Sequence, residues 1–421
     1  MNSNHVIFCR QCLYGDSHPL GLTINEDGLC SGCIIHEEKN YLDWNYRWKK
    51  LEKIADEYRT KKNLNYDCIV PVTGGQDSYY LMHIVKNKLG LNPLMVTYNK
   101  YFNTPLGIQN LSNLRIKFNS DILIQNVNPI SIKKIIRTTL REFGSMYWAN
   151  IAGQTVFPVL TSIRKKIPLI IWGAHQGIEQ VGMFSHEHEV EMTRRYRKDH
   201  DLMGYEADDL LNTFDILKEK DIWQFRYPDN ADLRANNVRG IYLSNYIRWD
   251  PIAQHREMVK LYDYKTANLS RTFDIYDYTD CYNYLDIHDL LKLNKHGYSK
   301  VTDHVSREIR HKRISKDDGE KIVNKYEQAE YKYKNQFLSF LDVTDKGLDL
   351  ICDYHKNKNF WNNPELDTWE FNGWSRMRNL DNKDYFKKNI INVKHNLEQL
   401  APDNIELGMS PEYITVGKGW P

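Results

Sequence analysis

The sequence predicts an α/β protein built on a doubly wound parallel sheet, with a small cysteine-rich module before it and a helix-rich region after it. Short apolar, β-branched runs alternate with helical patterns from about residue 69 to residue 173. The first run stops at the Gly74-Gly75 turn, and a helical pattern starts directly afterwards at Tyr79. Strands and helices that alternate at this spacing form right-handed crossovers, and ligands then bind at the carboxyl ends of the strands.

The cysteine-rich module contains two C-x2-C pairs separated by seventeen residues, which are Cys9, Cys12, Cys30 and Cys33. This spacing is typical of a four-thiolate zinc site, and four thiolates complete a tetrahedral ion, so we expect a structural Zn²⁺. An iron–sulfur cluster is the alternative occupant, whereas disulfides are unusual in a reducing cytoplasm. We therefore place a zinc ribbon at residues 1–40.

The glycine turn has the composition of a phosphate-binding loop. Two glycines let the backbone pass close to an anion, unpaired N–H groups at the helix start point toward it, and Thr73 and Ser78 add hydroxyl donors. The spacing is neither that of the common NTPase loop nor that of the dinucleotide fingerprint. A purely structural turn is the alternative. The residues expected to bind the ligand here are Thr73, Gly74, Gly75, Gln76, Asp77 and Ser78.

Further strands are expected at 94–98, 122–127 and 167–173, so three strand ends converge on one crevice. These ends are residues 73–78, 98–104 and 173–179. Asp77 and Glu179 are candidate Mg²⁺ ligands, because Mg²⁺ prefers oxygen ligands and usually takes one or two carboxylates. In the alternative interpretation Asp77 only complements the helix dipole and Glu179 is a solvated loop residue.

Three arginines recur at intervals of three residues, at Arg307, Arg310 and Arg313, which predicts one side of a helix. Guanidinium groups on one face suit a phosphate or a carboxylate. In the alternative interpretation they pair with acidic neighbours such as Glu308 and Asp317. We expect Arg310, together with Asp77 and Ser78, to act in catalysis.

Composition favours a globular enzyme whose net charge produces no strong electrostatic field. The 57 basic and 55 acidic residues give a net charge of +2, which disfavours a dedicated nucleic-acid-binding protein. No apolar run approaches the roughly 20 residues of a membrane span, and the first residues lack the features of a secretory signal. We expect a cytoplasmic protein with neither membrane nor nucleic-acid partners.

The motifs together resemble a known family. Thr73-Gly-Gly-Gln-Asp-Ser78 resembles the SGGxDS loop of the PP-loop ATP pyrophosphatases, with Thr73 in place of the usual serine. The same sequence contains the two cysteine pairs and three further motifs. These are Val181-Gly-Met-Phe-Ser-His186, Asn245-Tyr-Ile-Arg-Trp-Asp250 and Gly297-Tyr-Ser-Lys-Val-Thr-Asp-His304. From Cys9 to about Tyr326 the chain looks like the N-acetyl sugar amidotransferase family.

The resemblance implies a fold, cofactors and site residues. It implies a PP-loop ATP-binding domain of the adenine nucleotide alpha hydrolase-like type at residues 41–210 and a helical substrate- or partner-binding region at residues 211–421. ATP and Mg²⁺ are the implied cofactors. Tyr98, Asn99 and Gly173 are the implied further nucleotide contacts.

The implied reaction is ATP-dependent conversion of an acetamido group to an acetamidino group on an N-acetyl sugar or sugar nucleotide. Members of this family act in lipopolysaccharide and nonulosonic-acid pathways, such as that of pseudaminic acid. AMP is transferred to the acetamido oxygen, and ammonia then displaces AMP. A PP-loop tRNA-thiolating enzyme, which delivers sulfur to an adenylated base, and a non-enzymatic scaffold are the alternatives.

Nitrogen delivery implies a partner. Enzymes of this kind commonly take ammonia from glutamine, which requires a catalytic cysteine. Residue 2 is asparagine, and Cys68, Cys281 and Cys352 lie in no nucleophile-elbow motif. We therefore expect a separate glutaminase subunit, with an ammonia-channel subunit as an optional third component.

Overall fold

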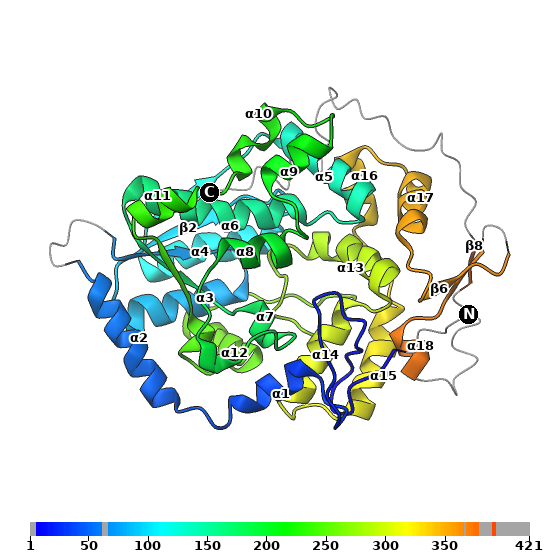
Figure 1. The fold of residues 1–421 in the computed structure, drawn as a ribbon, viewed down its shortest axis with the longest axis horizontal. Coiled ribbons are helices and arrows are strands. Elements are labelled where there is room, and N and C mark those ends of the chain that lie inside the picture. The colour runs from blue at the N-terminus through cyan, green and yellow to red at the C-terminus, as the bar shows by residue number, and fades with distance from the viewer. Residues whose placement is uncertain (1–5, 61–65, 366–367, 379–389, 393–421) are drawn as a thin grey trace.

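The computed structural model describes residues 6–60, 66–365, 368–378 and 390–392, and its centre is a parallel β-sheet (Figure 1). Five strands pair in the order β3-β2-β1-β4-β5, all in parallel. The strands are β1 (Cys68–Pro71), β2 (Pro93–Tyr98), β3 (Ile122–Gln125), β4 (Leu169–Trp172) and β5 (Arg239–Tyr242). The strand order reverses between β1 and β4, which is the switch point of a doubly wound sheet. The predicted fold class is confirmed.

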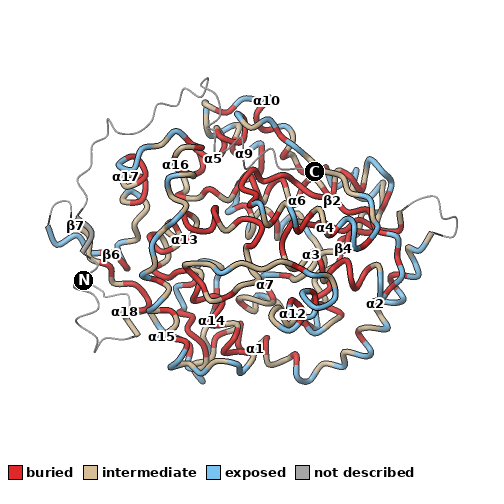
Figure 2. The backbone as a smooth tube through the Cα atoms, turned by 180° about the vertical axis from the view of Figure 1, so that it is seen from behind, coloured by how far each residue is buried: buried red, intermediate tan, exposed pale blue. Residues whose placement is uncertain are grey.

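Helices cover both faces of the sheet, so its inner strands β1, β2 and β4 are among the most deeply buried parts of the chain (Figure 2). On one face α6 (Trp148–Lys165) packs Val156 and Val159 against Ile69 of β1. On the other face Val70 of β1 contacts a core that includes Leu114. Neighbouring residues of a strand point to opposite faces, and a strand buried on both faces is therefore continuously apolar. The helices of the second face are α2 (Trp44–Tyr58), α3 (Gln76–Met82), α4 (Pro105–Phe118) and α12 (Pro251–Tyr262).

The sheet crosses the domain boundary that the sequence analysis places at residue 210. β5 pairs with β4 from Arg239 to Tyr242, and α12 packs on α3. The sheet layer therefore extends to about residue 262. The strand was not predicted because Arg-Gly-Ile-Tyr is short and half polar, and its pairing with β4 rather than a strand-like pattern determines its conformation.

A second core is built from helices of both halves of the chain. Phe337, Phe340, Leu341, Leu348 and Ile351, which recur at helical spacing in the sequence, are buried in it. They pack with Ile132, Ile135 and Ile136. The helices around this core are α5 (Pro129–Phe143), α9 (Ala207–Thr213), α10 (Glu219–Ile222), α13 (Tyr282–His296), α16 (Lys334–Leu341) and α17 (Asp345–His355).

The cysteine-rich module shares a third core with the C-terminal region, and Figure 1 shows the N-terminal segment beside α14 and α15. Tyr14 lies in this core with Val301, Val305 and Trp374, and the Trp374 ring stacks on Tyr298 at a centroid distance of 4.0 Å. The module is therefore docked onto residues nearly three hundred positions further along the chain. The surrounding elements are α1 (Ser31–Glu38), α14 (Lys300–Arg310), α15 (Lys316–Glu327), α18 (Trp374–Arg378), β6 (Trp361–Asn362), β7 (Thr368–Phe371) and β8 (Ile390–Asn392).

Short helices complete the description: α7 (Gln176–Glu179), α8 (Arg194–Tyr196) and α11 (Asn230–Ala235). No helix in the described parts of the chain has the length and apolar character that a membrane crossing requires. The last part of the predicted C-terminal region, residues 393–421, lies outside the described residues.

Candidate active site

The glycine loop, residues 73–78, joins β1 to α3 at the centre of the sheet. The Thr73 N–H donates to Ser78 Oγ at 2.8 Å, and the Gly75 N–H donates to Thr73 Oγ1 at 2.9 Å. The two predicted hydroxyls therefore hold the loop in shape. A Cβ atom on Gly74 would overlap the Gly107 carbonyl group at the start of α4, which explains why glycine is needed there.

A distant part of the chain, residues 272–281, lies across this loop; we call it the covering segment. The Gln76 amide donates to Asp277 Oδ1 at 2.9 Å, and Asp280 Oδ1 lies 3.3 Å from the position that a Cβ on Gly75 would take. Lys100 Nζ contacts Asp280 Oδ2 at 2.5 Å. Tyr278 has φ +55°, a left-handed conformation that is costly for a residue other than glycine. The surrounding contacts hold the segment in this strained conformation over the loop.

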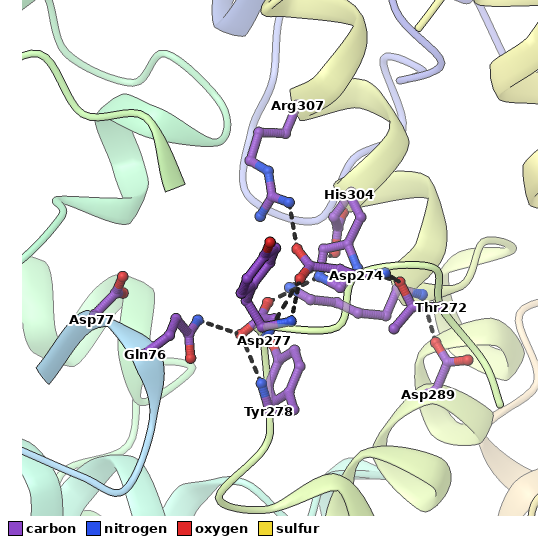
Figure 3. Close-up of polar contacts among 12 residues, drawn as sticks. Gln76, Asp77, Thr272, Asp274, Asp277, Tyr278, Asp289, His304 and Arg307 are labelled. Carbon is purple, nitrogen blue, oxygen red and sulfur yellow. Dashed lines mark hydrogen bonds and ion pairs between the residues drawn. The ribbon is translucent and has the colours of Figure 1, made fainter. Parts of the chain in front are cut away.

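Polar side chains of the covering segment and α14 form a connected group around Asp277 (Figure 3). His304 Nε2 lies 2.9 Å from Asp277 Oδ2, and His304 Nδ1 lies 2.6 Å from Thr272 Oγ1. Arg307 donates to Asp274 at 2.5 Å. We call Thr272, Asp274, Asp277, His304 and Arg307 the Asp277 group.

The electrostatics of this group keep Asp277 ionised. Burial raises the pKa of Asp277, but the hydrogen bond from His304 and the charges of His304, Lys300 and Arg307 hold it well below its usual range. One oxygen or nitrogen each from Asp274, Asp277 and His304 lie within 4.8 Å of one another, a spacing that also suits a metal ion. Arg307 already forms an ion pair with Asp274, however, so a metal ion there would compete with the guanidinium group.

The loop and the Asp277 group open into one crevice of about 560 Å³. Gln76 and Asp77 line it from the sheet side, and Lys292, Lys300 and His304 line it from α13 and α14. The cysteine-rich module contributes further wall residues, which are Tyr14, His18, Pro19, Leu20 and His36.

The two predicted Mg²⁺ ligands differ in whether a cationic side chain is already paired with the carboxylate. Asp77 Oδ1 lies 2.8 Å from His255 Nε2, and 43% of its side chain is exposed toward the crevice. Glu179 forms an ion pair with Lys39, and its other oxygen lies 3.8 Å from His186 Nε2. Although burial raises the pKa of Glu179, the Lys39 charge lowers it to about 2. Mg²⁺ binding stays a prediction for both, and only Asp77 has no lysine or arginine partner among the described residues.

The three arginines do not form one anion site. Helix α14 ends at Arg310, so Arg313 lies beyond it and pairs with Asp250 at 2.8 Å. Arg307 pairs with Asp274. This pairing with acidic neighbours is the alternative given by the sequence, although the partners are not all those expected.

Arg310 contacts the cysteine cluster, although it also lines the crevice. Its guanidinium donates to the Gln180 carbonyl at 2.7 Å, and its Nη2 lies 3.5 Å from Cys30 Sγ. Thiolates around a divalent ion carry excess negative charge, and a buried cation offsets part of it. The catalytic role of Arg310 stays a prediction, because Nη2 is engaged at the cluster and Nη1 at the carbonyl groups of residues 179 and 180.

The four predicted metal-binding cysteines come together as expected, and all are buried. The Sγ atoms of Cys9 and Cys33 are 3.9 Å apart, and those of Cys12 and Cys30 are 3.6 Å apart. A tetrahedral ion with Zn–S bonds of about 2.3 Å requires sulfur separations of roughly 3.8 Å. The N–H groups of Gln11 and Cys30 also point at Cys9 Sγ, at 3.4 and 3.3 Å. The donor set therefore fits Zn²⁺.

Of the remaining predicted nucleotide contacts, Tyr98 and Asn99 are buried and Gly173 is half-buried. The Tyr98 ring packs so closely on Gly153 that a Cβ there would overlap it. Asn99 bonds to Asn126 at 2.7 Å and to Asn103 at 2.6 Å, and Gly173 lies beside Leu81 and Trp249. Their contact with a nucleotide stays a prediction, as does that of Thr73, Gly74, Gly75 and Ser78, which are not among the residues lining the crevice.

The covering segment was not predicted from the sequence. Its aspartates, Asp274, Asp277 and Asp280, recur every three residues in a stretch rich in tyrosine. That regular spacing was the available signal, but nothing in the sequence indicated that the segment lies on a loop two hundred residues earlier.

Comparison with known proteins bears on the C-terminal wall of the crevice. Residues 270–379 match the family described as "LPS biosynthesis protein WbpG-like, C-terminal domain". The match begins at the covering segment and includes α13 and α14. It confirms the predicted relationship to proteins of lipopolysaccharide biosynthesis.

Two other similarities are more limited. The uncharacterized protein MJ1599 of Methanocaldococcus jannaschii is 30% identical over 108 residues, which cover 24% of this chain and 37% of that protein. The chain therefore spans little more than a third of this curated relative. An NH3-dependent NAD synthetase from Campylobacter jejuni, solved with nitrate, is 14% identical with a TM-score of 0.28, over 46% of this chain and 95% of its own. The fold class rests on the strand order described above.

Proposed function

Starting from a chain whose residues 270–379 are WbpG-like, we propose that this protein is an ATP-dependent amidotransferase of lipopolysaccharide biosynthesis. It converts the acetamido group of an N-acetyl sugar, free or nucleotide-linked, into an acetamidino group. One observation carries the proposal: Gln76 and Asp77 of the glycine loop, at the sheet's switch point, line the same crevice as the WbpG-like region. A nucleotide on the loop and a sugar on the WbpG-like wall would meet there.

The chemistry requires activation of a poor electrophile. An amide oxygen leaves badly, and transfer of AMP to it, with release of pyrophosphate, gives a good leaving group. Ammonia then adds to the carbon and AMP departs. The protein has to position the reactants, neutralise charge and exclude water, so that the activated amide is not hydrolysed. Asp77 suits Mg²⁺ on the ATP phosphates, because it is the exposed carboxylate beside the loop.

A separate glutaminase is the proposed nitrogen source, with an ammonia-channel subunit as an optional addition. Cys68, Cys281 and Cys352 are all buried, and burial raises the pKa of Cys352 to about 12 and those of Cys68 and Cys281 further. Thiols in this state are poor nucleophiles, since the thiolate is the reactive form. The purified chain should therefore use ammonium salts and hardly use glutamine until the partner is added.

The test is an incubation with MgATP, ¹⁵N-ammonium and a panel of acetamido sugars and their nucleotide conjugates. AMP and pyrophosphate should form only with the correct sugar, and mass spectrometry should show oxygen replaced by ¹⁵NH. Gly75→Val should abolish nucleotide binding, and Asp77→Asn should weaken the Mg²⁺-dependent turnover. ADP and phosphate as products would contradict the mechanism, and sulfur transfer to tRNA would support the thiolation alternative instead.

A further inference from the structure

Asp277 differs from most other carboxylates of the crevice in having no strong cation paired with it. Asp303 contacts Lys292 at 2.5 Å and Lys300 at 3.3 Å, Asp274 is paired with Arg307, and Glu179 is paired with Lys39. Among the described residues, Asp277 forms an ion pair only with His304, and 21% of its side chain is exposed to the crevice. An ionised carboxylate with this exposure is free to receive a cation.

The position of Asp277 is fixed from three directions. Gln76 of the glycine loop and the Tyr278 N–H donate to Oδ1, at 2.9 and 3.0 Å. His304 donates to Oδ2 at 2.9 Å. Thr272 Oγ1 lies 2.6 Å from His304 Nδ1 and also accepts from the Asp274 N–H at 3.2 Å, so Thr272 holds the imidazole ring with its other nitrogen toward Asp277. Oriented in this way, the carboxylate needs no reorganisation when charge develops beside it.

The proposed reaction generates such a charge next to the loop. When the amide oxygen bonds to the α-phosphorus and pyrophosphate leaves, the nitrogen lone pair moves toward the carbon and the carbon–nitrogen unit becomes cationic. Ammonia then adds through its lone pair, one of its protons leaves to solvent, and the carbon–oxygen bond breaks to release AMP. The centre is therefore cationic after activation and again in the amidinium product, and it is neutral only in the tetrahedral intermediate between loss of the proton and departure of AMP.

We propose that Asp277 is a catalytic residue whose carboxylate faces the cationic carbon–nitrogen centre, and that His304, Gln76 and Thr272 are positioning residues that hold it there. This inference rests on the proposed function, because it assigns a role within that reaction. It divides the two carboxylates that line the crevice beside the loop between two cations: Asp77 would hold the metal of MgATP, and Asp277 would face the organic cation. The lowered pKa of Asp277 fits this role, since the group must stay ionised.

The experiment compares two small probes of nearly the same shape, acetamidinium and neutral acetamide, binding to the full chain at constant ionic strength. The wild-type protein should bind acetamidinium at least about tenfold more tightly, the size of one charge-assisted hydrogen bond. Asp277→Asn should bring the two affinities together. Asp201→Asn is the matched control, because Asp201 also lines the crevice and is paired with a histidine, His200, at 2.8 Å. Asp201 has no hydrogen bond to the glycine loop among those of the described residues.

Two further measurements keep the test decisive. If Asp277→Asn fails to fold, Gln76→Leu removes one of the bonds that hold Asp277 and should reduce the preference for acetamidinium. A preference unchanged in these variants, or lost in Asp201→Asn instead, overturns the inference. Loss of Mn²⁺ binding by Asp277→Asn with the preference unchanged also overturns it, because the carboxylate would then serve the metal. The probes need neither ATP nor sugar, so a wild-type protein that makes no sugar-dependent AMP refutes the proposed function separately.

Discussion

The cysteine cluster and the Asp277 group are two clusters of polar side chains on α14 and its neighbours. They differ in whether a charged group remains exposed to the crevice. At the cluster, the sulfurs face one another. The terminal nitrogens of Arg310 contact a sulfur and donate to the carbonyl groups of residues 179 and 180. At the Asp277 group, hydrogen bonds fix the carboxylate from behind while one side faces the crevice. A closed polar site stabilises the fold, whereas an open one keeps a charge available for chemistry.

The largest effect is expected at the closed site. Cys30→Ser removes one thiolate of a structural site, and metal binding in such sites contributes folding free energy directly. We expect a loss of solubility or of several kcal/mol of stability, with zinc content falling in parallel by elemental analysis. Cys352→Ser is the control, because Cys352 is buried in another core. A folded, metal-free Cys30→Ser protein of wild-type stability would show that the cluster is not structural.

Arg310→Met is the next test, and it addresses the predicted catalytic role of this residue. It removes the cation from the buried thiolates and leaves the Gln180 carbonyl without this donor, which costs about 3–5 kcal/mol when a buried charged partner is lost. Thermal unfolding should show this loss, while the soluble fraction keeps most of its turnover per molecule. A stable variant without turnover would instead place Arg310 in the chemistry.

Acid should destabilise the protein through His175, which has no carboxylate or hydroxyl partner of the kind that His304 has in Asp277 and Thr272 among the described residues. The His175 ring lies among Tyr196, Tyr242 and Phe184, and burial lowers its pKa to about 4. Its folded-state pKa lies below the unfolded value of about 6.5, so its contribution is present above that value and is lost as the pH falls toward 4. This amounts to about 3 kcal/mol.

The measurement is urea unfolding from pH 7 to pH 4, with His175→Phe for comparison. Phenylalanine keeps a ring in the aromatic surroundings but does not titrate, so the variant should lose stability less steeply over this range. Equal slopes for the two proteins would show that other groups carry the acid sensitivity.

The smallest effect is expected at the open site. Thr272→Val keeps the side-chain volume and removes the hydroxyl 2.6 Å from His304, which corresponds to about 1 kcal/mol for one hydrogen bond. Turnover should fall roughly tenfold or less with little change in melting temperature. An unchanged rate would mean that His304 needs no support from Thr272.

Local patterns were enough to predict the centre of the fold. The apolar runs that became β1, β2 and β4 are buried on both faces, and such strands have a simple composition. The cysteine spacing likewise predicted a cluster that the structure brings together. In contrast, β5 depends on its neighbour β4, and its short sequence carries no pattern of its own.

The predictions that depended on distant contacts were less complete. The spacing of Arg307, Arg310 and Arg313 indicated one helix face, but α14 ends at Arg310. Arg307 and Arg313 both pair with Glu308, whereas Arg310 contacts the cysteine cluster. The Asp277 group was missed for the same reason. Asp277 and Gln76 of the glycine loop, which donates to it, are about two hundred residues apart, and single-sequence periodicity contains no information about such a pairing.

The shared core of the cysteine-rich module and the C-terminal region has a consequence for synthesis of the chain. Cys9 and Cys33 leave the ribosome early, but the core that encloses them includes Val301 and Trp374. At 5–20 residues per second, the cysteines wait on the order of twenty seconds to a minute for that cover. During this interval the nascent thiols are exposed to solvent. The yield of folded protein should therefore depend on the cell's chaperones and on its free zinc, and not only on the stability of the finished fold.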